Sequence, residues 1–110
     1  MSIVKQSETT KQTIAEGRTR YLAHTDQLMM AVIDLNDGPT EAPDPPHSHP
    51  HEQITYVAEG EIYFILGEQK HHLKAGDLFT VAGNVPHSVQ LLTKKVRLVD
   101  TFTPIREEFL

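Results

Sequence analysis

Cysteine is absent from all 110 residues of this chain, which excludes disulfide bridges and zinc sites built from thiolates. A glycine-rich phosphate loop is also missing. Lysine and arginine number ten against fifteen acidic residues, and the basic residues form no stripe along the chain. We therefore expect no nucleic-acid partner and no binding to an anionic membrane surface.

Long hydrophobic runs are lacking too. The longest, LMMAVI at residues 28–33, is far too short to cross a bilayer, and the polar start MSIVKQSETTKQ contains no stretch of signal-peptide length. We therefore expect a cytoplasmic protein that does not enter a membrane. Metal chemistry is then the most direct way for so small a chain to have an activity.

What the chain does have is a series of short β-rich runs. They lie at residues 19–24, 27–35, 53–59, 61–67, 70–73, 77–82, 87–92 and 96–103. Turn residues such as Asn36-Asp37-Gly38 and Glu59-Gly60 separate them, and the only helical feature expected is a single turn within residues 10–16. This pattern predicts an all-β sandwich or barrel. The length predicts a single domain over residues 1–110 with one core.

A proline-rich segment interrupts the β-rich runs at residues 38–46. Its sequence, GPTEAPDPP, contains four of the seven prolines and cannot form a paired central strand. We predict a rim loop that delivers His47, because candidate metal ligands follow immediately. The alternative interpretation is a flexible linker.

Four side chains are candidate ligands for one metal ion. His47, His49 and Gln53 share one parity, so an extended strand points all three to the same face. His87 follows a second turn cluster, 34 residues after Gln53. Imidazole nitrogen and amide oxygen are both good ligands for a divalent first-row metal. The combination of these features with a glycine-closed hairpin at Gly60 predicts a metal site rather than a metal-sticky histidine tract.

His51 complicates this ligand set, because it has the same parity and forms a second H-x-H pair with His49. In that register the fourth ligand position falls on Thr55 or Tyr56, neither of which is a good ligand. We therefore prefer His47 and His49, with Pro50 turning His51 away, and whether His51 takes part stays open. The remaining histidines, at positions 24, 71 and 72, have no partner spacing and are interpreted as solvated or locally hydrogen-bonded.

A second group of candidate residues lies near the end of the chain. Leu98, Asp100 and Phe102 share strand parity, which places a carboxyl group between apolar residues on an inward face. A lone inward carboxylate is costly unless it is paired or functional. Arg106 follows beyond a proline and is expected to fold back toward the mouth of the fold. The alternative is a structural ion pair between Asp100 and Arg106, with Phe102 in the core.

These motifs resemble those of the cupins. The first cupin motif, H-x-H, three or four residues, Glu, six residues and Gly, reads here HSHPHEQITYVAEG from His47 to Gly60. The second motif, G-x5-P-x-G-x2-H-x3-N, is echoed by GDLFTVAGNVPHSVQL from Gly76 to Leu91. The departures are Gln53 for Glu, Ala82 for Pro, Asn84 for Gly and Leu91 for Asn. The resemblance implies a double-stranded β-helix, or jelly-roll, fold and a homodimer. The N-terminal arm of residues 1–12 is a second argument for a homodimer, because such an arm can pair with a neighbour's sheet edge.

The pattern D-x-F-x3-R near the C-terminus, together with H-x-H-x3-Q and a later histidine, is similar to that of the KdgF family of small cupins from pectin and alginate breakdown. That resemblance implies an enzyme that converts 4,5-unsaturated monouronates, which are small sugar acids, into linear 5-keto-4-deoxyuronates. It implies the metal ligands His47, His49, Gln53 and His87 and the substrate and catalytic residues Asp100, Phe102 and Arg106.

The metal is expected to be a divalent transition ion, and nickel, zinc, manganese, iron and cobalt all suit three imidazoles and one amide. Because Gln53 is neutral, the site keeps the charge of the bare dication, which favours a Lewis acid over a redox centre. The alternatives are a metal-dependent cupin dioxygenase and a non-catalytic sugar-binding cupin.

Overall fold

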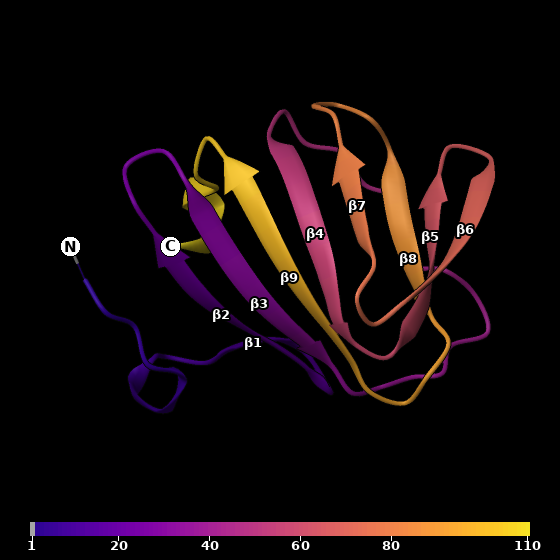
Figure 1. The fold of residues 1–110 in the computed structure, drawn as a ribbon, viewed down its shortest axis with the longest axis horizontal. Helices are drawn as coiled ribbons and strands as arrows, with labels where there is room; N and C mark the ends of the chain where they lie inside the picture. The colour runs from indigo at the N-terminus through magenta and orange to yellow at the C-terminus, as the bar shows by residue number, and fades with distance from the viewer. Residues whose placement is uncertain (1) are drawn as a thin grey trace.

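The structure, a computed structural model, describes residues 2–110. Over that range nine strands form two antiparallel sheets, which make the two sides of a sandwich (Figure 1). The larger sheet has the order β1-β2-β3-β9-β4-β7, and the smaller has the order β6-β5-β8. The strands are β1 (Gln12–Ala15), β2 (Arg18–His24), β3 (Met29–Leu35), β4 (Glu52–Glu59), β5 (Glu61–Leu66), β6 (Gln69–Lys74), β7 (Leu78–Val81), β8 (His87–Leu91) and β9 (Val96–Thr103). The predicted all-β jelly-roll fold is confirmed.

The predicted turn at residues 10–16 is wrong, because Gln12–Ala15 forms the edge strand β1 and pairs with β2. Side-chain hydrogen bonds explain the difference: the Gln12 amide accepts from Arg20 Nε at 2.6 Å and donates to the Phe109 carbonyl at 2.8 Å. Met1 of the predicted N-terminal arm lies outside the described residues. The helical segments of residues 2–110 are two short 3-10 turns, η1 (Gln6–Glu8) and η2 (Glu107–Phe109), and no helix there is long and apolar enough to cross a membrane.

The central strands β4 and β9 show the alternation that the sequence predicts. Their buried positions recur at every second residue, as expected for strands with one face turned to a core. In their antiparallel register Gln53 lies opposite Phe102, and Thr55 lies opposite Asp100. Because both members of each pair point inward, these two strands bring a candidate metal ligand and the candidate catalytic carboxyl group to one face.

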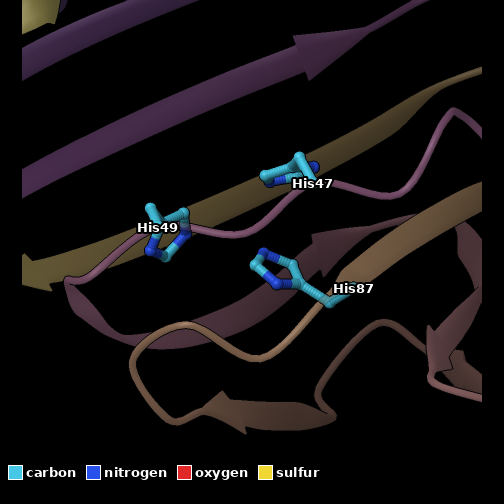
Figure 2. Close-up of side chains that lie close together, drawn as sticks. All are labelled: His47, His49 and His87. Carbon is cyan, nitrogen blue, oxygen red and sulfur yellow. The ribbon is translucent and has the colours of Figure 1, made fainter.

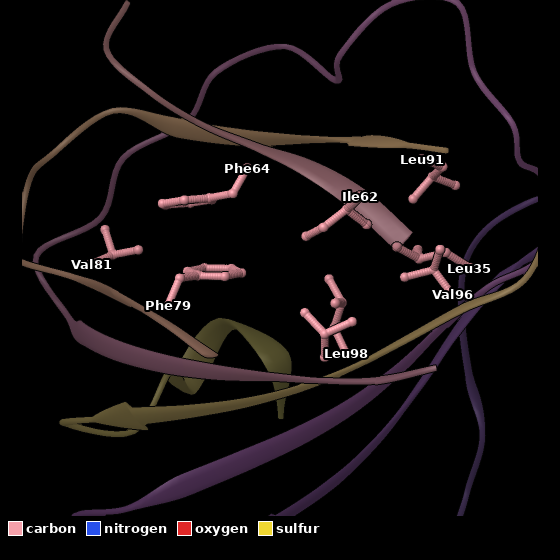
Figure 3. Close-up of a cluster of buried hydrophobic side chains, with 9 residues drawn as sticks. Leu35, Ile62, Phe64, Phe79, Val81, Leu91, Val96 and Leu98 are labelled. Carbon is pink, nitrogen blue, oxygen red and sulfur yellow. The ribbon is translucent and has the colours of Figure 1, made fainter. Parts of the chain in front are cut away.

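The hydrophobic core is divided into two clusters. The larger fills the space between the sheets (Figure 3) and consists of Leu35, Val57, Ile62, Phe64, Phe79, Val81, Leu91, Val96 and Leu98. Within it the rings of Phe64 and Phe79 stack with centroids 3.9 Å apart, which joins β5 to β7 across the sandwich. The smaller cluster contains Met29, Ala31 and Phe102. This division leaves the polar inward residues of β4 and β9 beside Phe102 rather than inside the larger cluster.

The proline-rich segment of residues 38–46 runs along the free edge of β8. Its amides at Gly38, Thr40 and Asp44 donate to backbone carbonyls at or near β8, at 3.0 to 3.2 Å. At its end His47 and His87 exchange both backbone hydrogen bonds, at 3.0 and 2.9 Å. These bonds fix the backbone of His47 directly opposite that of His87.

Two turns near the site depend on backbone conformations that few residues adopt. Gly60 closes the β4–β5 hairpin with φ of 85°, and an added Cβ would lie 2.3 Å from the Lys95 carbonyl oxygen, so only glycine fits. Asn84 stands where the cupin motif has glycine and has φ of 64°, as expected for a residue that tolerates the left-handed region. The backbone N–H of Asn84 donates a hydrogen bond to the His49 carbonyl oxygen. This bond connects the β7–β8 turn to the segment before β4.

Candidate metal centre and cavity

Three histidine side chains meet where the proline-rich segment, the start of β4 and the start of β8 come together. His47, His49 and His87 each offer a ring nitrogen, and these nitrogens all lie within 4.8 Å of one another. Figure 2 shows the three rings gathered in one place, with His87 reaching from β8 toward the other two. The ring centroids of His47 and His87 are 4.3 Å apart, and those of His49 and His87 are 5.0 Å apart. The predicted trio of histidines is therefore brought together.

Backbone carbonyls fix which nitrogen of two rings carries the proton. His87 Nδ1 lies 2.9 Å from the Val85 carbonyl and His49 Nδ1 lies 3.0 Å from the His51 carbonyl. Because a carbonyl only accepts, both Nδ1 atoms must be protonated, and a neutral ring then has its lone pair on Nε2. His87 Nε2 is buried and has no hydrogen-bond partner among the described residues. That atom is the kind of unsatisfied acceptor that a metal ion satisfies.

The surroundings of His47 and His49 favour the neutral form of these two rings. Burial of the ring, together with the neighbouring His87 and His49, lowers the pKa of His47 from 6.5 to about 4. Burial and the charge of Arg106 lower the pKa of His49. Neutral imidazoles with converging lone pairs are the donor set of a divalent transition metal, so the residues present fit such an ion.

Gln53 lies beside this trio with its amide oxygen toward it. Gln53 Oε1 is 3.0 Å from His49 Nε2, and the amide nitrogen donates to Thr55 Oγ1 at 2.8 Å. Because His49 Nδ1 already carries the ring proton, the contact between Nε2 and Oε1 brings two acceptors face to face. A cation bound between them would satisfy both atoms, which is consistent with the prediction of Gln53 as a ligand.

His51 lies outside the trio. Its ring centroid is 5.7 Å from that of His49, and the group of converging nitrogens does not include it. The contribution of His51 is its backbone carbonyl, which holds the His49 ring through Nδ1. The other histidines behave as predicted: His24, His71 and His72 are exposed and contact Thr25, Gln69 and Glu61, respectively.

Asp100 is buried on β9, where its carboxyl group accepts a hydrogen bond from a neighbouring side chain. Its Oδ1 accepts from the Thr55 hydroxyl at 2.7 Å. Burial raises the pKa of Asp100 from 3.8 to about 6, while the Thr55 hydrogen bond and the charge of Arg106 act in the opposite direction. A carboxyl group with a pKa near 6 can both accept and donate a proton close to neutral pH.

The structural ion pair between Asp100 and Arg106 is not formed within residues 2–110. Arg106 Nε donates instead to Glu108 at 2.8 Å, and its guanidinium lies 4.2 Å from the Phe109 ring centroid and 5.3 Å from that of Phe102. The alternative interpretation of the sequence was therefore wrong in this respect, since each group has another partner. Among the residues that the structure describes, no cationic side chain forms an ion pair with the buried Asp100 carboxyl group.

One cavity of about 230 Å³ is lined both by candidate metal ligands and by the candidate catalytic residues near the C-terminus. Its lining includes His47, Gln53, His87, Asp100, Phe102 and Arg106. The volume is below the roughly 300 to 1,000 Å³ of pockets for drug-sized ligands, so it suits a smaller molecule.

Sequence reasoning missed several residues of this region. Arg18, Asp44 and Phe109 also line the cavity, and no motif marked them. The motifs do not mark Thr55 as a functional residue, although its strand parity places it on the inward face with Gln53. That parity was the available signal for Thr55.

Comparisons with known proteins agree with this geometry. The sequence matches the Cupin domain family over residues 34–102. It is 34% identical over 105 residues to the pectin degradation protein KdgF of Dickeya dadantii, covering 94% of this chain and 93% of that protein. The fold superposes on KdgF from a Halomonas species with a TM-score of 0.89 and 30% identity, covering 100% of this chain and 99% of that one. It superposes on an RmlC-like cupin from Shewanella frigidimarina with a TM-score of 0.89 and 32% identity, covering 100% and 96%. The chain therefore belongs to the cupin superfamily and, within it, to the KdgF family of small cupins.

Proposed function

We propose that this protein converts 4,5-unsaturated monouronates from pectin or alginate breakdown into linear 5-keto-4-deoxyuronates. The observation that carries the proposal is a buried carboxyl group, Asp100, with a pKa raised to about 6, lining the same small cavity as His47 and His87 of the histidine trio. The name of the Dickeya relative, a pectin degradation protein, supports a sugar acid as the substrate class. A cavity of about 230 Å³ suits a monosaccharide better than a polymer chain.

One divalent transition ion belongs to the proposal. Its ligands would be His47, His49, Gln53 and His87, and its identity would be nickel, zinc, manganese, iron or cobalt. When bound, such an ion supplies Lewis-acid stabilisation of negative charge that develops on a substrate oxygen. The role of the histidines is to present neutral nitrogens, and burial already holds the pKa values of His47 and His49 down.

Asp100 would move the proton. As a carboxylate it accepts the proton of the anomeric hydroxyl, C1 becomes an aldehyde carbonyl, and the bond from C1 to the ring oxygen breaks with its electron pair on that oxygen. The product of this step is an enolate at C5, with its negative charge on the former ring oxygen. Asp100 then donates its proton to C4 while C5 becomes a ketone. One proton has moved from oxygen to carbon, so the reaction balances without a co-reactant.

Arg106 and Phe102 would orient the substrate. The Arg106 guanidinium can bind the substrate carboxylate with two parallel hydrogen bonds, for which it must release Glu108. The side chain of Glu108 is 53% exposed, and exposed ion pairs contribute only about 0 to 1 kcal/mol, so the exchange costs little. Phe102 is buried within the smaller core cluster and gives the cavity an apolar wall.

Deuterium labelling tests the proposed chemistry. In heavy water the enzymatic reaction should place one deuterium at C4 of the linear product on a single face, because one positioned carboxyl group delivers it. The spontaneous reaction should label both faces. Proton NMR of the product distinguishes the two results, and a product labelled equally on both faces, at the spontaneous rate, would contradict the proposal.

We also propose that the protein is a homodimer. Large hydrophobic side chains are exposed on the outer face of the larger sheet and in the turn before β3: Leu28, Met30, Ile54, Tyr56 and Leu78. Several exposed hydrophobic side chains on one side of a sheet are typical of an interface. A second copy of the chain is the occupant that we propose.

A further inference from the structure

Two consecutive hydrogen bonds connect Gln53, which lies beside the histidine trio, to Asp100. The Gln53 amide nitrogen donates to Thr55 Oγ1 at 2.8 Å, and Thr55 Oγ1 donates to Asp100 Oδ1 at 2.7 Å. Thr55 is 0% exposed and lies opposite Asp100 in the β4–β9 register. The candidate metal ligand and the candidate proton carrier are therefore joined by a single buried hydroxyl group.

The Thr55 hydroxyl group sets the donor and acceptor roles in these two hydrogen bonds, because it has only one proton to donate. When Asp100 is a carboxylate, that proton goes to Asp100, and the oxygen of Thr55 must accept from the NH₂ group of Gln53. The amide oxygen is then turned toward His49. In the reverse direction the hydroxyl donates to the amide oxygen, and the NH₂ group, which cannot bind a metal, faces the histidines.

We infer that Thr55 is a positioning residue that couples the metal centre to Asp100, by presenting the Gln53 oxygen to the metal and holding the Asp100 carboxylate in place with the same hydroxyl. This inference rests on the proposed function for its catalytic consequence, but its structural part concerns metal binding alone. Thr55 itself touches neither the metal nor the substrate.

If Thr55 had a purely structural role, its shape and strand preference would matter and its hydroxyl group would not. The site is completely buried, and a valine would preserve its shape and its preference for strands while removing the hydroxyl. The loss would leave the Gln53 NH₂ group without its acceptor and the Asp100 carboxylate without its donor. The effect should then appear in metal affinity and turnover, and should depend on the presence of Gln53.

The test is a double-mutant cycle on the binding of cobalt(II), followed by visible absorption with the metal alone. We expect Thr55→Val to weaken cobalt binding about tenfold, because the amide no longer has one preferred orientation. Thr55→Ser, which restores the hydroxyl, should stay within about threefold of the unmodified protein. In a Gln53→Ala background, Thr55→Val should change the affinity less than about twofold, since the partner to be oriented is gone.

Two controls separate this coupling from general damage. Thr80→Val, at an exposed position on β7 of the same sheet, should leave cobalt affinity unchanged. Circular dichroism and the melting temperature check the fold of each variant. If Thr55→Val does not fold, Thr55→Cys replaces it, because a thiol is a weak donor of similar size and should give an intermediate loss.

An equal loss from Thr55→Val in both backgrounds would overturn the inference and leave Thr55 a structural residue, and so would an unchanged affinity. Absence of cobalt binding to the unmodified protein would overturn the metal centre and the inference together. If the unmodified protein binds cobalt but does not act on an unsaturated monouronate, the proposed function is wrong, while the inference about Thr55 and metal binding still stands or falls on the cobalt affinities. Where the protein does act, Thr55→Val should lower kcat at least tenfold with little change in KM, and Thr55→Ser should restore most of it.

Discussion

At the scale of single residues, the account depends on Asp100. Its carboxyl group is buried, contacts one hydroxyl and has no cation in contact among the residues described, so its charge is destabilising to the fold. The sequence predicted this position from strand parity alone. It could not predict the partner, because Arg106 follows a proline and its direction depends on the packing of the last residues against Phe109.

The first prediction concerns stability and pH in the metal-free protein. Because the pKa of Asp100 rises from 3.8 to about 6 on folding, the native state binds the proton more tightly than the unfolded chain. The contribution of this group to the free energy of unfolding is therefore largest below pH 4 and falls, by about 3 kcal/mol in all, as the pH rises through 6.

Asp100→Asn should abolish this part of the pH dependence and stabilise the metal-free protein at pH 8. Urea unfolding of both proteins at pH 4 and pH 8 measures the difference. An equal loss of stability with pH in the two proteins would contradict the raised pKa of Asp100.

The second prediction concerns the pH dependence of the activity. The proposed mechanism begins with Asp100 as a carboxylate, and its pKa is raised to about 6 by burial. The rate should therefore fall as the pH is lowered through about 6, where the carboxylate becomes protonated. A kcat profile from pH 4.5 to 8, on protein shown to retain its metal throughout, tests this expectation. A rate independent of pH across that range would remove Asp100 as the initial base.

At the scale of elements, the site is made by strand pairing. The register of β4 with β9 sets Thr55 against Asp100, and the backbone bridge between His47 and His87 closes the histidine trio. Period-2 parity predicted which side chains of each strand point inward. Which strands become neighbours is a tertiary property, so the Thr55–Asp100 contact could not be derived from the sequence. The strand at Gln12–Ala15 was missed because its pairing depends on hydrogen bonds to Arg20 and Phe109.

The third prediction tests how the proline-rich segment is held. Arg18 on β2 forms ion pairs with Asp37 at 3.0 Å and with Asp44 at 2.7 Å, and its own side chain is only 17% exposed. Arg18→Gln should loosen the segment that fixes His47, with roughly tenfold faster hydrogen exchange at the Thr40, Asp44 and His47 amides.

The matched control is Arg97→Gln, which removes a similar two-bond pair with Asp34 away from that segment. It should leave exchange at those three amides unchanged. Equal acceleration in both variants would show that the effect is general destabilisation.

At the scale of the whole molecule, the larger hydrophobic cluster and the candidate site occupy different parts of the fold. The larger apolar cluster lies between the sheets, while the polar inward residues gather beside the smaller cluster around Phe102. The sequence predicted the all-β fold because its short runs, turn residues and motif glycine at Gly60 agree with one another. It did not reveal the cavity, whose shape depends on Phe109 and Arg18 from segments far apart in the chain.

The fourth prediction concerns the proposed homodimer. Ile54 is 52% exposed on the outer face of the larger sheet, where a second copy would bury it. Sedimentation should give a dimer for the unmodified protein and a monomer for Ile54→Lys, since a buried unpaired ammonium group is costly. Leu110→Lys, at a 64% exposed position at the C-terminal end, should remain a dimer. A monomeric unmodified protein at micromolar concentration would contradict the proposal.

The most direct test of the central claim is the decay of the ultraviolet absorbance of a purified 4,5-unsaturated monouronate, corrected for the spontaneous rate. The metal-loaded protein should accelerate the decay, the chelated protein should lose the acceleration, and metal-loaded Asp100→Asn should be about 10²-fold slower or more. A decay no faster than the spontaneous rate with metal-loaded protein would contradict the proposed function. In that case the dioxygenase and sugar-binding alternatives would be tested next, by oxygen consumption and by ligand titration.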